Sequence, residues 1–86
     1  MEKLGSSKEM YAYLSSILSG DELLHATAVH DSIVDAQNGK FAFKVPDTAI
    51  NNAWNEVQWL KAKGVDLARI GIDERKIAAR RAKIRL

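Results

Sequence analysis

Two segments of the chain carry apolar side chains at helical spacing, and they restrict the fold to one built largely from helices. In the first segment such residues recur at intervals of three and four: Met10, Tyr13, Leu14 and Ile17. This spacing predicts a helix with one apolar face. Ser6 and Glu9 have the spacing of a capping box, so we expect Ser6 to be the N-cap. We expect Ser19–Gly20 to end this helix.

The second segment lies between Pro46 and Gly64 and predicts a long amphipathic helix over residues 47–63. Asp47 can cap this helix, and Gly64 can end it in the left-handed conformation. Its apolar face consists of Ile50, Ala53, Trp54, Val57 and Leu60. Trp59 lies about 180° away from Ile50 at the 100° per residue of an α-helix. We therefore expect Trp54 in the core and Trp59 outside the apolar face.

Residues 20–38 support two interpretations. Helical spacing is kept by Leu23, Ala26, Val29, Ile33 and Ala36. Asn38–Gly39 would then end a helix, but Asn-Gly is also the strongest two-residue β-turn signal. Phe41–Val45 has the pattern of a strand, and a strand needs a hydrogen-bonding partner. Because its sequence neighbour costs the least loop entropy, we favour a β-hairpin with a strand near residues 27–37.

The predicted fold class is therefore α+β. It consists of an N-terminal capped helix, a β-hairpin around Asn38-Gly39, the long amphipathic helix 47–63 and a basic C-terminal helix. The alternative, an all-α four-helix bundle, holds if residues 20–38 are helical. At 86 residues, residues 1–86 are expected to form a single small domain.

Charge is distributed unevenly along the chain. Residues 1–74 hold seven Lys/Arg against eleven Asp/Glu, a net charge of −4, whereas residues 75–86 hold six basic residues and no acid, a net charge of +6. We expect a C-terminal helix over Glu74–Arg85, with Asp73 as its N-cap. Ile72 and Ile77 would form a hydrophobic staple at its start.

The basic residues of this last helix are the predicted nucleic-acid-binding site: Arg75, Lys76, Arg80, Arg81, Lys83 and Arg85. Like charges at helical spacing repel one another, and phosphates would relieve that repulsion. Recognition is expected to be mostly independent of sequence, since no helix-turn-helix, zinc-finger or ribonucleoprotein signature is present. The competing interpretation is that the acidic residues of this chain, or of a second copy, neutralise the helix.

Trp59 supports an alternative function. A Trp outside the core is a typical interface anchor. The chain would then be a protein–protein interaction module: an adaptor, an inhibitor or a homo-oligomer subunit such as a homodimer. Its partner-binding residues would be Trp59, Asn52, Asn55 and Lys63. The competing interpretation is that helix 47–63 is sandwiched, with Trp59 covered by the N-terminal helix or by the C-terminal helix.

Catalysis has little support in the sequence. His25 and His30 do not converge on one face of a helix or strand. The sequence has no P-loop, no Gly-x-Ser-x-Gly motif and no cysteine. We therefore predict a non-enzymatic protein with no catalytic residues, no metal site and no cofactor. No apolar run approaches 18 residues and the first seven residues resemble no secretory signal, so we expect a cytoplasmic protein without a membrane partner.

Overall fold

The structure, a computed structural model, describes residues 7–41 and 45–84. These residues form four α-helices and one 3₁₀-helix and contain no strand. In chain order the elements are α1 (Ser7–Ser15), α2 (Gly20–Gln37), α3 (Pro46–Ala62), η1 (Leu67–Ile70) and α4 (Glu74–Arg81). The predicted α+β fold with its β-hairpin is therefore wrong, and the all-α alternative fits.

Asn38 and Gly39 end α2 instead of turning a hairpin. Gly39 has a φ of 82°, and its N–H donates to the Ala36 carbonyl at 3.2 Å. The N–H of Lys40 reaches back to the Asp35 carbonyl at 2.7 Å. This pair of bonds is a Schellman motif, which satisfies carbonyls that the last helical turn leaves open. The left-handed conformation that Asn-Gly favours serves both a hairpin turn and a helix end, so the dipeptide did not distinguish them.

Burial across α2 shows why the helical interpretation holds. The residues of α2 that are buried are Leu23, Ala26, Ile33, Ala36 and Gln37. Their spacing follows the period of a helix, whereas a strand would direct alternate residues to opposite sides. Residues 42–44, the centre of the expected strand, lie outside the described residues. Phe41 precedes them in an irregular segment and packs, half-buried, against the core.

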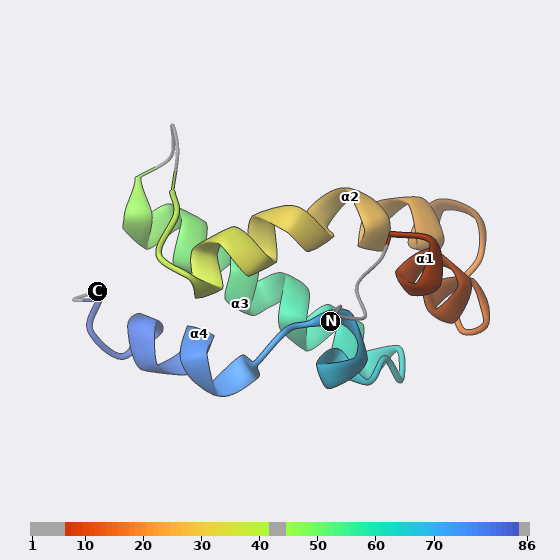
Figure 1. The fold of residues 1–86 in the computed structure, drawn as a ribbon. Helices are drawn as coiled ribbons and strands as arrows, with labels where there is room; N and C mark the ends of the chain where they lie inside the picture. The colour runs from red at the N-terminus through yellow and green to blue at the C-terminus, as the bar shows by residue number, and fades with distance from the viewer. Residues whose placement is uncertain (1–6, 42–44, 85–86) are drawn as a thin grey trace.

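The helices pack around α3. Figure 1 shows α2 and α3 lying side by side, with α4 beside α3 and α1 against the N-terminal part of α2. The end of α2 also contacts α4, so α4 lies across both long helices. Among the described helices, none combines the length and the apolar character needed to cross a membrane.

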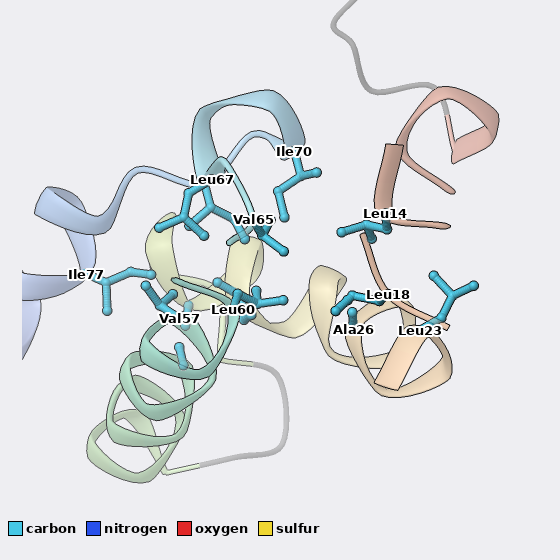
Figure 2. Close-up of a cluster of buried hydrophobic side chains, with 14 residues drawn as sticks. Leu14, Leu18, Leu23, Ala26, Val57, Leu60, Val65, Leu67, Ile70 and Ile77 are labelled. Carbon is cyan, nitrogen blue, oxygen red and sulfur yellow. The ribbon is translucent and has the colours of Figure 1, made fainter. Parts of the chain in front are cut away.

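One buried cluster joins all four α-helices and η1, as Figure 2 shows for its central side chains. Its most deeply buried large members are Leu14, Ile33, Val57, Leu60 and Ile77. The predicted apolar face of α3 is buried except for Trp54, which is half-buried at the edge of the cluster. Ile17, which we expected in the core, is 36% exposed, whereas the next residue, Leu18, is buried.

The ends of α1 and α3 differ in part from the expectation. α1 ends at Ser15, four residues before the predicted Ser19. Its predicted N-cap, Ser6, lies outside the described residues. α3 begins at Pro46 because proline at the first helical position already has a helical φ. The predicted Asp47 cap is therefore wrong.

Three other predicted signals are confirmed. Gly64 follows α3 with a φ of 89°. The Asp73 carboxylate caps α4 by accepting a hydrogen bond from the Arg75 N–H at 3.0 Å. The two residues of the predicted staple, Ile72 and Ile77, are both buried. α4 ends at Arg81, earlier than the predicted Arg85.

Two side chains of α2, Gln37 and His30, form hydrogen bonds with the segment that connects α3 to α4. Gln37 is 7% exposed, and its Nε2 donates to the Gly71 carbonyl at 3.2 Å. The Oε1 of the same side chain accepts from the Asp73 N–H at 2.6 Å. His30 Nε2 lies 2.7 Å from the Ile70 carbonyl, which can only accept, so Nε2 carries the proton. These contacts fix the chain that leads into α4.

Replacing Gln37 should destabilise the fold. A Gln37→Leu substitution leaves the Gly71 carbonyl and the Asp73 N–H without their partner, and we expect a loss of about 1–3 kcal/mol in the free energy of unfolding. Urea denaturation followed by circular dichroism measures this loss. Asn55→Leu, at an exposed polar position of α3, is the control. Equal unfolding free energies for the two variants would contradict the assigned role of Gln37.

Candidate nucleic-acid interface

Arg80 connects α4 to the end of α2. Its Nε donates to the main-chain carbonyl of Gln37 at 3.0 Å, and Gln37 is the last residue of α2. A cation is favourable there because the carbonyl end of a helix carries partial negative charge. A Cβ at Gly39 would lie 3.0 Å from an Arg80 Nη atom, so the guanidinium packs directly against the glycine. Arg80 is thereby half-buried and held in one orientation.

Arg81 connects α4 to α3 on the other side of the helix. Its guanidinium lies 5.0 Å from the centroid of the Trp54 ring, a cation–π contact. Its Nε also donates to the Asn51 Oδ1 at 3.3 Å. Both partners are neutral, as is the carbonyl that binds Arg80. The two arginines are therefore positioned within the fold while their charges remain uncancelled.

The remaining described cations of α4 and of the turn after it face solvent. Lys76, in α4, and Lys83, just beyond its end, are exposed. The Arg75 side chain is 94% exposed, and its Nε lies 3.8 Å from an Asp73 oxygen. Within residues 7–41 and 45–84, no carboxylate lies within 4.0 Å of the basic groups of Lys76, Arg80, Arg81 or Lys83. Arg85 lies outside the described residues.

Three glutamates pair with basic groups outside α4, which bears on the predicted neutralisation of this helix within the chain. The ion pairs that tie helices together are Glu22–Lys63, Glu56–His25 and Glu74–Lys61. Only Glu74 belongs to α4, and its partner lies on α3. In the part of the chain that the structure describes, these glutamates therefore do not neutralise the basic residues of α4.

Three of the cations line one shallow groove between the end of α2 and α4. The groove has a volume of about 420 Å³ and is lined by Gln37, Asn38, Lys76, Ala79, Arg80 and Lys83. None of these six residues is acidic. Lys76 lies in α4, and Lys83 lies two residues beyond its end at Arg81. We call this feature the basic groove. Neither Arg75 nor Arg81 lines it.

The predicted partner-binding residues lie on α3, apart from the basic groove. Trp59 is half-buried, and its ring meets the His25 ring edge to face at 4.9 Å. The Lys63 ammonium lies 5.9 Å from the Trp59 centroid and 2.6 Å from a Glu22 oxygen. His25 in turn lies 2.6 Å from Glu56. Trp59 and Lys63 thus contact α2. The sequence analysis expected the N-terminal or the C-terminal helix in that place.

Asn52 and Asn55 are exposed on α3. Asn52 lines a cleft of about 220 Å³ between α2 and α3, whose polar lining also includes Asp35 and Glu56. The structure therefore gathers Lys76, Arg80 and Lys83 at one site. Trp59, Lys63 and Asn52 lie elsewhere, where α3 faces α2.

Sequence reasoning missed the neutral partners of the two arginines. Gln37 was predicted only as the end of a strand and Trp54 only as a core residue, and no role was predicted for Asn51. The residues joined by these hydrogen bonds are 43 positions apart for Gln37 and Arg80, and 30 positions apart for Asn51 and Arg81. No local spacing connects them, so only the packing of α4 across α2 and α3 shows the contacts.

Both histidines of α2 have partners within the chain. His30 contacts Ile70 and Asp31, and His25 contacts Glu56. Among the described residues, no group of three or more His, Asp or Glu side chains is placed to hold a metal ion. The prediction of a non-enzymatic protein without a cofactor stays a prediction.

Glu74 is the acid that anchors the start of α4. Its carboxylate accepts from Gln58 Nε2 at 3.0 Å and from Lys61 Nζ at 2.9 and 3.0 Å. The hydrogen bond from Gln58, and then that from Lys61, hold the pKa of Glu74 below its ordinary value. A carboxyl whose pKa is lower in the folded chain stabilises the fold above its unfolded pKa. This stabilisation is lost as the pH falls through the folded pKa.

Acid should therefore remove the contribution of Glu74. We expect Glu74→Gln to lower the midpoint of urea unfolding at about pH 6, and the difference from the unaltered chain to shrink as the pH falls through the folded pKa of Glu74, because its carboxyl is then protonated in both states. Asp21→Asn is the control, because Asp21 also lies in a first helical turn but is exposed. A difference for Glu74→Gln that stays constant with pH would contradict the assignment.

Comparison with known proteins identifies no relative of this chain. No family model, no curated protein and no solved structure matches it. Its function has therefore to be inferred from its own residues and their geometry.

Proposed function

We propose that this chain is a small non-enzymatic accessory protein that binds nucleic acid, mostly independently of sequence, through α4. One observation carries the proposal: the cations of α4 have neutral partners or solvent around them. In the described residues, Lys76, Arg80, Arg81 and Lys83 have no carboxylate within 4.0 Å. A cytoplasmic location is part of the same proposal.

Phosphate is the anion that suits this surface. A protein that neutralises phosphates with Lys and Arg releases condensed counterions, and this release drives binding without reading the bases. The exposed Ala79 and Ala82 are small and allow a polyanion to approach the helix closely. Arg80 and Arg81 are already held in place by Gln37, Asn51 and Trp54, so little side-chain freedom is lost when they bind.

A protein-interaction function, through Trp59, Asn52, Asn55 and Lys63, is the weaker proposal. Trp59 and Lys63 already contact His25 and Glu22 of the same chain. A partner that used them as anchors would have to replace those contacts. Only the two asparagines remain exposed without such contacts.

Fluorescence anisotropy with labelled oligonucleotides tests the proposal. The chain should bind two unrelated 20-mer sequences with similar affinity, and the logarithm of the affinity should fall linearly with the logarithm of the salt concentration. For duplex DNA the slope should lie between about −2 and −5, since each neutralised phosphate contributes about 0.9.

Substitutions of the basic residues test whether α4 and the turn after it make the binding contacts. Neutralising the three exposed cations in Arg75→Gln/Lys76→Gln/Lys83→Gln should weaken binding at least tenfold at low salt, because at least two phosphate contacts are lost. The control, Asn52→Ala/Asn55→Ala, should bind as tightly as the unaltered chain. No binding at low salt, or equal losses in the two variants, would refute the proposal.

A further inference from the structure

We propose that the basic groove is the site where a run of backbone phosphates binds, with Lys76, Arg80 and Lys83 as its cations and Asn38 as a neutral donor. This inference rests on the proposed function and deepens it, because it separates the groove from the other cations of α4. The groove is the place where two cations of α4 and Lys83, just after the helix, meet a polar residue at the end of α2.

Arg80 is the fixed element of the site. Its hydrogen bond to Gln37 uses only the Nε hydrogen, and no acceptor among the described residues takes a hydrogen bond from its Nη atoms. A guanidinium has five N–H donors, so the Nη pair stays available for two phosphate oxygens. The contact with Gly39 holds the guanidinium plane against the end of α2. Arg80 therefore offers a donor pair of fixed orientation, which suits phosphate recognition.

Lys76 and Lys83 lie on either side of Arg80 along the groove. In the sequence they lie four residues before and three residues after it; Lys76 and Arg80 line the groove from α4, and Lys83 lines it from the turn that follows α4. The groove therefore offers three cations in a row, which suits a run of phosphates better than a single phosphate. Ala79 lies among them and adds no bulk to the lining.

The other described cations of α4 lie outside this site. Arg81 turns to Trp54 on the opposite flank, where its Nε is bonded to Asn51. Arg75 is 94% exposed, its nearest carboxylate is Asp73, and it does not line the groove. A strand bound in the groove would therefore depend on both lysines and much less on Arg75.

The first test locates the contact by nuclear magnetic resonance. Titration of the full chain with a single-stranded oligonucleotide that has hydroxyl groups at both ends should shift the amide signals of Asn38, Gly39, Ala79 and Lys83. Signals of α1 and of the N-terminal part of α2 should stay unchanged. Inorganic phosphate at the same phosphate concentration should produce smaller shifts, because it cannot span the groove. Full saturation by inorganic phosphate at that concentration would overturn the assignment to a run of phosphates.

The second test compares variants with equal charge. Lys76→Gln/Lys83→Gln should reduce the salt slope of duplex binding by about two, since two phosphate contacts are lost at about 0.9 each. Lys8→Gln/Arg69→Gln removes the same charge from α1 and η1 and should keep the slope within about 0.5 of the unaltered chain. Arg75→Gln should behave like this control.

The outcomes separate the inference from the proposed function. If the oligonucleotide binds with a steep salt dependence but the groove variant keeps its slope and the groove amides do not shift, the groove assignment is wrong while nucleic-acid binding stands. If the oligonucleotide does not bind the unaltered chain at low salt, both are wrong.

Discussion

The hydrogen bonds of Gln37 hold α4 in its place. α4 is only eight residues long, and its one fully buried side chain is that of Ile77. Apolar burial of that size fixes the helix weakly, so its position depends on polar contacts. Gln37 supplies them at both ends of α4: its side chain binds Gly71 and Asp73 before the helix, and its carbonyl accepts from Arg80 near the end.

The neutrality of these contacts decides the chemistry of the surface. An arginine paired with a carboxylate would be held equally well, but its charge would be cancelled and its donors used. Here the partners of Arg80 and Arg81 are a main-chain carbonyl, an amide oxygen and an aromatic ring. The carboxylates of Glu22, Glu56 and Glu74 meanwhile pair with basic groups on other helices. The positive charge of α4 is therefore not cancelled by these carboxylates, and it can attract a polyanion.

Local signals in the sequence predicted those parts of the fold that depend on local physics. The period of the apolar residues and Gly64 placed α3, and Asp73 with its two isoleucines placed the start of α4. Asn38–Gly39 was misassigned because one backbone conformation serves two structures, and only burial of α2 against its neighbours distinguishes them. Trp54, expected in the core, and Trp59, expected outside the apolar face, are both half-buried against the same cluster. Their partners, His25 and Arg81, belong to distant segments, and no spacing in the sequence reveals those contacts.

The central claim is that α4 recognises the charge of a phosphate backbone. Its most direct test compares a phosphodiester oligonucleotide with an analogue of the same sequence whose backbone is uncharged, measured by calorimetry at low salt. The account predicts that the charged strand binds and the uncharged strand shows no measurable binding, because no phosphate remains to be neutralised. Equal affinity for the two strands would contradict it.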